Sequence, residues 1–339
     1  MWSRGERFVV GNLCRHNNLA GAQMTPVSHE ARPMPARSVS VVIPSRDGRD
    51  TLKRALDSIV PGAQHVHEVI VVFSNSPAEF KAYCEALLPR YANAFAARAL
   101  DSGAASNGAI ARNVGMQAAA APLLALLDDD DEWLPNKLSV YLEHIARLSL
   151  SGDFVLFSQV VSCREDRSAW RLFPSVSYDG GRFSDFVLSP LGGAQTSSLL
   201  LPTRLAQRVG FDPSLVRHQD YDFCLRLEEA GARFVGIEQP LAYWYQRGNG
   251  VEKGGTFDFC TAWVQKNAHR ISRAAYIGYI EKDMFTVARI SKRMNDFFAF
   301  QRMNLTRREI AGSLWRLARR AVKSARRRLS PEAGAFVSR

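Results

Sequence analysis

The chain has 339 residues, enough for one large domain or two, and its 46% hydrophobic and 23% charged residues are typical of globular proteins. This composition excludes collagen-like, coiled-coil and wholly disordered chains. The net charge of +11 is unusual and, taken alone, would suggest a nucleic acid or an anionic membrane as partner. Most of it comes from residues 301–339, which contain 11 Lys or Arg and only two Glu.

Cysteine usage and apolar runs give no indication of an extracellular or membrane-spanning chain. The five cysteines are widely spaced and form no C-x-x-C pair, which argues against a disulfide framework and against a zinc site. No apolar run approaches the ~18 residues that a membrane span needs. The N-terminus lacks the apolar core of a signal peptide. We therefore expect a cytoplasmic protein.

The first half of the chain alternates between predicted strands and helices. Residues 1–37 show neither the two-residue apolar period of a strand nor the 3.6-residue period of a helix, and three prolines stand near their end. We therefore expect a poorly ordered leader. From residue 38 onward, apolar β-branched runs typical of buried strands alternate with apolar residues at helical spacing. The expected elements are strand 39–43, helix 52–59, strand 68–73, helix 80–88, helix 110–118 and strand 123–127.

The second half of the chain is less regular and ends in helices. The expected elements are helix 138–148, a strand-rich stretch over 153–201, helix 220–230, strand 234–237 and helices from about residue 256 to the end. Strand–helix alternation with almost continuously apolar strands predicts an α/β fold, in which helices flank a mostly parallel sheet.

Four consecutive aspartates, Asp128–Asp131, directly follow the strand predicted over 123–127. In open α/β sheets ligands bind beyond the carboxyl ends of the strands, and four neighbouring carboxylates raise one another's pKa unless a cation compensates them. Mg²⁺ or Mn²⁺ prefers oxygen ligands and commonly bridges one or two carboxylates to substrate phosphates. A solvated run that caps the helix near Pro135 accounts for the same residues. The local pattern leaves both interpretations open.

A second acidic pair, Asp220 and Asp222, stands at the start of the helix predicted over 220–230. Carboxylates in a first turn stabilise a helix through its dipole by ~0.3–1 kcal/mol each. The alternative role is that of a catalytic base. The pair alone does not decide between the two roles.

Six segments in chain order resemble those of bacterial family 2 glycosyltransferases, which have the GT-A fold. They are Val39–Ser45, Ala111–Gly115, Leu126–Asp131, Gly210–Asp212, Asp220–Asp222 with Arg226–Leu227, and Pro240–Arg247. The resemblance implies a GT-A glycosyltransferase domain over about residues 38–250, and it leaves residues 251–339 as a helical C-terminal region.

The resemblance implies an inverting, metal-dependent transfer of a sugar, of the hexosyltransferase type, from a nucleoside diphosphate sugar to an acceptor hydroxyl. Asp128 and Asp130 match the family's D-x-D motif, which places Asp128 near the nucleotide sugar and Asp130 on Mn²⁺ or Mg²⁺. Asp131 would assist through water. Asp220 matches the general base, and Asp222 is the neighbouring alternative. The residues implied to contact the nucleotide sugar are Pro44, Ser45, Ser74, Arg112, Asn113, Asp128, Asp129 and Arg247.

Some of these positions have a second interpretation. Arg247 is either a cation for the diphosphate or a solvated loop residue, and Arg112 and Asn113 either shape the nucleotide pocket or hold a helix against the sheet. The family's usual Asp-Asp pair after the second strand is replaced by Phe73-Ser74, so the sequence does not predict the nucleobase. The family's acceptors imply a sugar or a lipid-linked glycan as partner, in cell-surface polysaccharide, lipopolysaccharide or other glycoconjugate biosynthesis.

The C-terminal residues predict a basic amphipathic helix over about 307–329. Thr306 and Glu309 form a capping-box pattern at its start. One arc of the helix is apolar, with Trp315 at its edge, and the opposite arc is basic. This pattern fits an anionic membrane surface, which would place the enzyme on the inner face of the cell membrane. The same pattern fits equally well a helix whose apolar arc packs on the main domain.

Two other functions compete with the glycosyltransferase. One is a nucleotidyltransferase or another metal–diphosphate enzyme on a related fold. The sequence gives this alternative no support, because it contains no Gly-rich phosphate loop. The other is a non-catalytic binder of anionic surfaces that uses the basic tail. Nucleic acid is not expected as a partner, because no recognised binding motif accompanies the charge.

Overall fold

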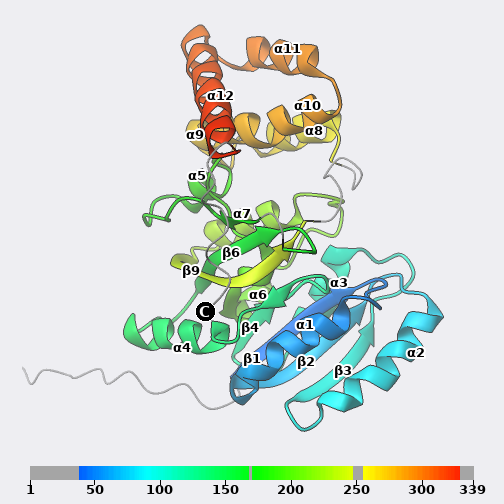
Figure 1. Cartoon of the computed structure of the whole chain (residues 1–339). Helices are drawn as coiled ribbons and strands as arrows, with labels where there is room; N and C mark the ends of the chain where they lie inside the picture. The colour runs from blue at the N-terminus through cyan, green and yellow to red at the C-terminus, as the bar shows by residue number, and fades with distance from the viewer. Residues whose placement is uncertain (1–37, 168–169, 247–254, 329–339) are drawn as a thin grey trace, which may run out of the picture. The chain divides into compact units, whose positions relative to one another are not determined.

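The computed structural model describes residues 38–167, 170–246 and 255–328, with side chains up to residue 322 (Figure 1). The leader predicted over residues 1–37 and the predicted site residue Arg247 lie outside the described residues.

A mixed sheet of nine strands runs through the described part of the chain. The strands are β1 (Val39–Ser45), β2 (Val66–Phe73), β3 (Ala96–Asp101), β4 (Leu123–Leu126), β5 (Glu132–Trp133), β6 (Phe154–Cys163), β7 (Trp170–Phe173), β8 (Leu200–Pro202) and β9 (Arg233–Tyr245). Their order is β3-β2-β1-β4-β8-β6-β9-β5, and β7 pairs with β6. Neighbours among β1–β4 are parallel, as are β6 and β9, whereas β8 is antiparallel to both β4 and β6.

Helices surround this sheet and then continue as a C-terminal group. The α-helices are α1 (Leu52–Ile59), α2 (Ala78–Leu87), α3 (Gly108–Ala118), α4 (Lys137–Arg147), α5 (Phe183–Val187), α6 (Thr203–Val209), α7 (Gln219–Glu229), α8 (Phe257–Asn267), α9 (Arg273–Tyr279), α10 (Phe285–Ile290), α11 (Met294–Asn304) and α12 (Arg307–Arg328). Three short 3₁₀ helices are η1 (Val60–His65), η2 (Leu88–Tyr91) and η3 (Thr196–Ser198), and η4 (Ile280–Met284) is a π-helix between α9 and α10.

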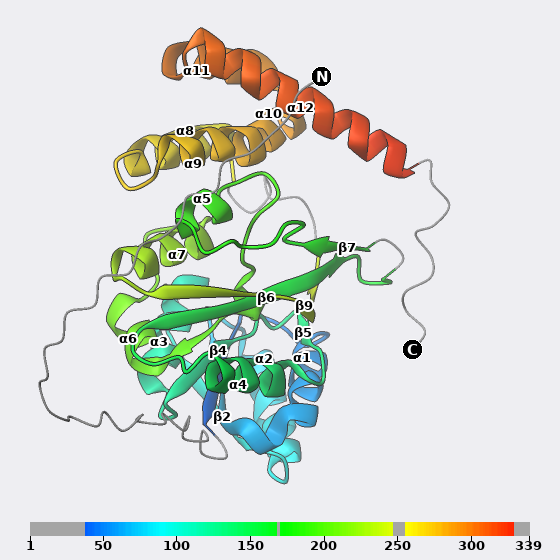
Figure 2. The ribbon, with the colours of Figure 1, turned by 90° about the vertical axis from the view of Figure 1, so that its left-hand side faces the viewer.

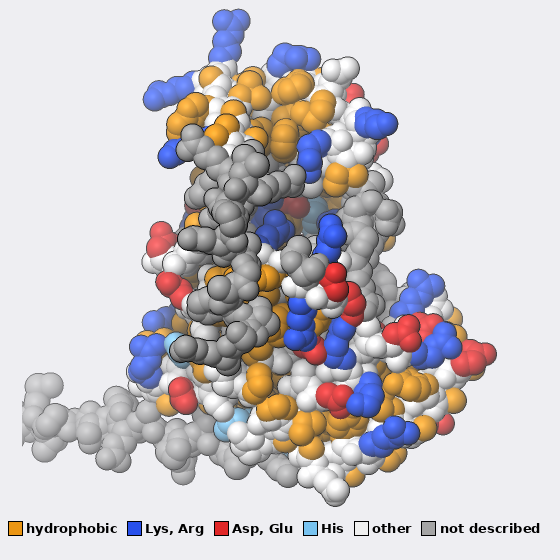
Figure 3. All heavy atoms as spheres, viewed as in Figure 1, with side chains coloured by type: hydrophobic (Ala, Val, Ile, Leu, Met, Phe, Trp, Pro, Cys, Tyr) orange, Lys and Arg blue, Asp and Glu red, His pale blue; other side chains and the backbone are white. Residues whose placement is uncertain are grey.

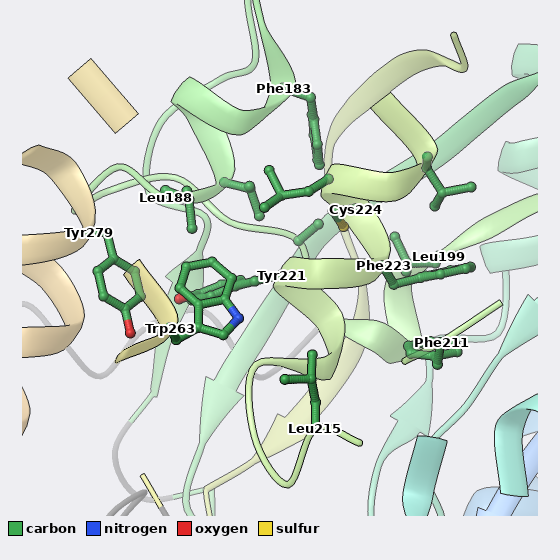
Figure 4. Close-up of a cluster of buried hydrophobic side chains, with 14 of the residues drawn as sticks. Phe183, Leu188, Leu199, Phe211, Leu215, Tyr221, Phe223, Cys224, Trp263 and Tyr279 are labelled. Atoms are coloured by element: carbon green, nitrogen blue, oxygen red, sulfur yellow. The ribbon is translucent and has the colours of Figure 1, made fainter. Parts of the chain in front are cut away.

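The two faces of the sheet build two hydrophobic cores, because successive side chains of a strand point to opposite faces. In β1, Val41 and Ile43 pack in the core that includes α1, α2 and α4. Val42 packs in the other core, which includes α3, α6 and α7. That second core continues into α8 and α9, as Figure 4 shows for Trp263 and Tyr279 beside Tyr221 of α7. The C-terminal helices thus share a core with α7 and the sheet. Figure 2 shows α8 and α9 above α5 and α7, with the sheet below these.

One glycine sets the distance between α3 and the sheet. A Cβ at Gly115 would collide with the side chain of Val42 in β1 and lie 3.0 Å from Val72 Cγ2 in β2. The absence of a side chain therefore lets α3 approach the strands closely, which fixes the position of Arg112 one turn earlier.

The observed elements confirm the predicted α/β class and most of the predicted helices and strands. They add four elements that the sequence did not indicate, one of which is α6. β3 is an alanine-rich, partly exposed strand without the apolar run of a buried one, and β5 has only two residues. The stretch expected to be rich in strands also contains α5. The capping box is confirmed, since Thr306 N donates to Glu309 Oε2 at 2.8 Å and Glu309 N donates to Thr306 Oγ1 at 3.3 Å. Even the longest described helix, α12, is too polar to span a lipid bilayer.

Candidate active site

The predicted site residues gather at the carboxyl ends of β1 and β4. These two strands are parallel neighbours, so their carboxyl ends lie at the same edge of the sheet, where α/β proteins bind ligands. Pro44 and Ser45 are the last residues of β1, and Asp128–Asp131 follow β4. Ser74 is buried next to them, with its backbone N–H donating to Ser45 O at 2.8 Å.

Asp129 is the aspartate that packs against the end of β1. Its carboxylate accepts a hydrogen bond from Ser45 Oγ, and the backbone of Gly48 lies so close that a Cβ there would be 2.5 Å from Asp129 Oδ2. The pKa of Asp129 is raised to about 7, mainly by burial. The charges of Asp130 and Asp128 contribute to this rise, and the hydrogen bond from Ser45 opposes it.

Asp128 is joined by Arg112 to the start of α7. Arg112 Nη2 donates to Asp128 Oδ1 at 2.5 Å, and Arg112 Nη1 donates to Gln219 Oε1 at 3.1 Å. The backbone N–H of Asp128 also donates to Ser197 Oγ at 2.9 Å. A single arginine on α3 therefore connects the acidic segment with the helix that carries Asp220.

Asp131 is held by the protein itself. It is 1% exposed, and its carboxylate accepts hydrogen bonds from Gln195 Nε2 at 2.7 Å, Ser197 Oγ at 2.6 Å and the backbone N–H of Tyr245 at 3.1 Å. Burial raises its pKa well above the ordinary value. These partners fasten the acidic segment to β9 and to the loop before β8, in place of the water-mediated role that the resemblance implied.

Asp130 is the remaining aspartate and is partly exposed. Its backbone carbonyl accepts a hydrogen bond from Arg54 Nη2 at 2.8 Å. Among the described residues no group of three or more His, Cys, Asp or Glu side chains is arranged to hold a metal ion. The described carboxylates therefore do not form a site in which protein side chains alone coordinate a metal ion. They fit an ion such as Mg²⁺ or Mn²⁺ that binds one or two carboxylates together with substrate phosphates and water.

Asn113 connects α3 to the segment before α7. Its Nδ2 donates to Phe211 O at 2.9 Å, and its Oδ1 accepts from Phe211 N at 2.8 Å. The preceding Gly210 has a φ of +62°, which favours glycine. Both halves of the Asn113 amide are thus used within the protein, and they hold the Gly210–Phe211 turn against α3.

The structure separates Asp220 from Asp222. Asp222 is buried and forms ion pairs with Arg270 at 2.8 Å and Arg226 at 2.9 Å. Asp220 is partly exposed, and its Oδ1 accepts a hydrogen bond from the backbone N–H of Tyr221 at 2.9 Å. Among the described residues no cation lies within ion-pair distance of Asp220. This geometry favours Asp220 as the carboxylate that is able to accept a proton.

Three charged residues near Asp220 were not predicted from the sequence: Arg217, Lys282 and Asp283. Burial raises the pKa of Asp220, and the positive charges of Arg217 and Lys282 partly offset that rise. Lys282 Nζ donates to Val187 O and to Gly192 O, both at 2.9 Å. Tyr221 Oη donates to Asp283 Oδ2 at 3.2 Å. The sequence signal for Lys282 and Asp283 is their charge in an otherwise apolar helical stretch, and Arg217 lies in a loop without such a signal.

Comparisons with known proteins identify the family of the chain. The family model for glycosyl transferase family 2 matches residues 40–188. The amylovoran biosynthesis glycosyltransferase AmsB of Erwinia amylovora is 30% identical over 241 residues, which are 70% of this chain and 79% of that protein. The chain belongs to glycosyltransferase family 2. It is therefore a glycosyltransferase. The putative colanic acid biosynthesis glycosyl transferase WcaA of Escherichia coli is 27% identical over 197 residues, 56% of this chain and 65% of that protein.

Solved structures support the fold of this family 2 glycosyltransferase. The mannosyltransferase PcManGT from Pyrobaculum calidifontis, in complex with GDP-Man and Mn²⁺, has a TM-score of 0.53 at 15% identity, covering 89% of this chain and 84% of that one. TarS 1–349 of S. aureus, in complex with UDP-GlcNAc, has a TM-score of 0.51 at 17% identity, covering 79% and 74%. The GT-A fold expected from the sequence is thus confirmed.

Proposed function

We propose that this glycosyltransferase transfers a sugar from a nucleoside diphosphate sugar to a hydroxyl of a glycan acceptor, with inversion at the anomeric carbon and with Asp220 as the general base. The observation that carries the proposal is the position of Asp220. It is free of ion pairs to the described cations and is connected through Gln219 and Arg112 to Asp128. A carboxylate placed in this way is able to take a proton beside the donor site.

The proposed step is a single displacement. Asp220 takes the proton of the acceptor hydroxyl while its oxygen attacks the anomeric carbon, and the bond from that carbon to the diphosphate oxygen breaks. Arg112 keeps Asp128 in place beside the donor, and Ser45 and Gly48 keep Asp129 in place. A Mn²⁺ or Mg²⁺ ion held by Asp130 and the donor diphosphate would stabilise the negative charge on the leaving nucleoside diphosphate.

The names of the relatives support the donor and the pathway that we propose. AmsB and WcaA are named for the biosynthesis of amylovoran and colanic acid, so we propose a role in cell-surface polysaccharide or related glycoconjugate biosynthesis. PcManGT and TarS were solved with nucleoside diphosphate sugars, and PcManGT with Mn²⁺ as well. These complexes support a nucleotide sugar and a divalent cation here. The nucleobase is left open, because Phe73-Ser74 carries no carboxylate.

The test combines donor binding with turnover. A thermal-shift panel of nucleoside diphosphates and their sugars, with Mn²⁺ and Mg²⁺, is expected to identify a donor, since a ligand at 100 times its Kd stabilises a protein by roughly 2.7 kcal/mol. Asp220→Asn is expected to keep donor binding and lose transfer, whereas Asp258→Asn, an exposed carboxylate 76% accessible, keeps both. Full turnover by Asp220→Asn, or release of pyrophosphate in place of a nucleoside diphosphate, would contradict the proposal.

We also propose that the enzyme works at an anionic membrane surface, to which α12 attaches it. Buried Ser313 and Leu317 face the protein body, and Arg316 and Arg320 bind Glu281. Ile310 of the apolar arc also packs against the core. Three other residues of the arc are exposed: Leu314 by 41%, Trp315 by 61% and Val322 by 54%. Figure 3 shows hydrophobic side chains with Lys and Arg around them over α11 and α12. Exposed aliphatic and Trp side chains among arginines fit an anionic lipid interface.

Vesicle sedimentation tests this attachment. The full chain is expected to bind phosphatidylglycerol vesicles and not phosphatidylcholine vesicles, and Trp315→Ser with Leu314→Ser is expected to release it. Trp170→Ser, on β7 and 37% exposed, serves as the control. Equal binding by wild type and the double variant would contradict the role of α12. Loss of a dimer in that variant, measured by light scattering, would assign the face to a second copy instead.

A further inference from the structure

The Arg217 guanidinium lies near the proposed general base and has no partner among the described residues. Arg217 precedes His218, the N-cap residue of α7, whose φ of 60° turns the chain into the helix. Arg217 Nε is buried and has no hydrogen-bond partner among the described residues, and no described carboxylate lies within ion-pair distance of its guanidinium. The residue is partly exposed, so a ligand can reach it.

The other described cations that act on the pKa of Asp220, Arg112 and Lys282, are already bound within the protein. Arg112 forms the ion pair with Asp128 at 2.5 Å. Lys282 donates two hydrogen bonds to the backbone carbonyls of Val187 and Gly192. Arg217 is thus the cation near Asp220 whose donors the described residues do not use.

Arg217 lies near residues of the C-terminal helices. Its positive charge lowers the pKa of Asp283 on η4 and of the Cys260 thiol on α8, while burial raises both. Asp128, in contrast, is paired with Arg112 of α3. Among the described residues, Arg217 thus differs from Arg112 in forming no ion pair with the acidic segment that is proposed to hold the donor.

The surroundings hold Arg217 in this position. His218 is 5% exposed, and its Nε2 lies 2.8 Å from Tyr279 Oη. Tyr221, Trp263 and Tyr279 pack together beside the start of α7, with 5.0 Å between the ring centroids of Trp263 and Tyr279 (Figure 4). Such packing holds the backbone at the start of α7, which reduces the ordering cost when a ligand binds there.

We propose that Arg217 binds an anionic group of the acceptor, a phosphate or a carboxylate next to the sugar that is glycosylated. The guanidinium presents a planar fork of N–H donors that matches the two oxygens of a phosphate or carboxylate. The acceptor class is therefore acidic or phosphorylated glycans. The proposal rests on the proposed function, since it takes Asp220 as the group that meets the attacking hydroxyl.

The experiment measures the binding of simple acceptor probes to the full-length enzyme saturated with its nucleoside diphosphate. Glucose 1-phosphate represents a phosphate, glucuronic acid a carboxylate, and methyl glucoside is the neutral match. Wild type is expected to bind one of the anionic probes at least about 10-fold more tightly than methyl glucoside. Arg217→Gln is expected to abolish that preference and Arg217→Lys to retain part of it. Arg233→Gln, an exposed arginine at the start of β9, is the control for loss of one charge.

The outcomes separate this inference from the proposed function. Unchanged preference in Arg217→Gln, or equal binding of all three probes by an enzyme that still binds its nucleoside diphosphate, overturns the acceptor role. Weaker binding of the nucleoside diphosphate itself by Arg217→Gln also overturns it, because Arg217 would then be a donor ligand. If no nucleoside diphosphate binds even to wild type, the proposed function fails first.

Discussion

Arg270 lies with its Nη1 2.8 Å from Oδ1 of Asp222, across the interface between α7 and the end of α8. Arg270 also binds Glu229, and Arg226 binds the other oxygen of Asp222. Asp222 is thus fixed in a buried ionic network. Asp220, two residues earlier, lies about 200° around the helix and faces the other way. The acidic pair that the sequence left ambiguous therefore divides into one structural carboxylate and one that is available for chemistry.

Substitution of the two aspartates is expected to have opposite effects. Asp222→Asn removes the charge that Arg270 and Arg226 share, and the free energy of unfolding is expected to fall by about 1–3 kcal/mol. Asp220→Asn is expected to leave stability nearly unchanged, or to raise it slightly, because it removes a desolvated charge. Urea unfolding of both variants measures this. Greater destabilisation by Asp220→Asn would mean that the structural role belongs to Asp220.

Gly48→Ala is expected to weaken donor binding. The added Cβ would lie 2.5 Å from Asp129 Oδ2 and 2.8 Å from Ser45 Oγ, so the carboxylate and the hydroxyl must separate or move. We expect the Kd for the nucleoside diphosphate to rise at least several-fold, measured by calorimetry. Gly181→Ala, in an exposed loop with Asp179 Oδ1 at 3.3 Å, is the matched control. An unchanged Kd in Gly48→Ala would remove the Ser45–Asp129 contact from the donor site.

The acid limb of the pH–rate profile is expected to respond to charges on η4. Asp220 must be ionised to act as a base, so kcat/KM falls as the pH drops through its pKa, which burial raises above the ordinary value. Arg217, Lys282 and Arg112 favour the ionised form, and Asp283 opposes it. Lys282→Met is therefore expected to move the limb to higher pH, and Asp283→Asn is expected to move it to lower pH.

These opposite shifts distinguish electrostatic coupling from structural damage. Loss of the two hydrogen bonds that Lys282 donates would lower activity at every pH, but it would not move the limb. Lys266→Met, an exposed lysine on α8, is the control. Shifts in the same direction for Lys282→Met and Asp283→Asn would show that the limb does not report on Asp220.

The sequence predicts the elements that have strong local patterns. The apolar runs of β1, β2 and β4 and the acidic segment after β4 are recognisable because a buried parallel strand needs continuous apolar residues. β3 lacks that pattern because it is only partly buried. Within Asp128–Asp131 the four residues are identical, so only burial and partners reveal that Asp131 is held internally while Asp130 is partly exposed.

The proposed acceptor side is the part that a local pattern does not reveal. Lys282 and Asp283 are about 60 residues from Asp220 in the chain, and tertiary packing alone brings them together. They lie on the π-helix η4, a wider turn that a 3.6-residue period does not predict and that often occurs at functional sites. Arg217 lies in a loop whose sequence has no distinctive spacing.

Glu281 links α12 to the same π-helix, and its loss is expected to release α12. It is 2% exposed, and its carboxylate accepts hydrogen bonds from Arg316 Nη2 at 2.6 Å and Nε at 2.9 Å, while its carbonyl accepts from Arg320 at 2.7 Å. Glu281→Gln and Arg316→Gln each break this pair, so both are expected to speed tryptic cleavage within α12, detected by mass spectrometry. Arg308→Gln, exposed at the start of α12, is the control.

The double variant tests whether the contact between Glu281 and Arg316 accounts for the stabilisation of α12. If Glu281 and Arg316 stabilise α12 mainly through each other, Glu281→Gln with Arg316→Gln is expected to be cleaved no faster than either single variant, since neighbouring substitutions that remove one interaction are not additive. Fully additive rates would mean that each residue acts through a different partner. Because Glu281 is next to Lys282 and Asp283 on η4, release of α12 is also expected to raise the KM for the acceptor while the Kd for the donor stays constant.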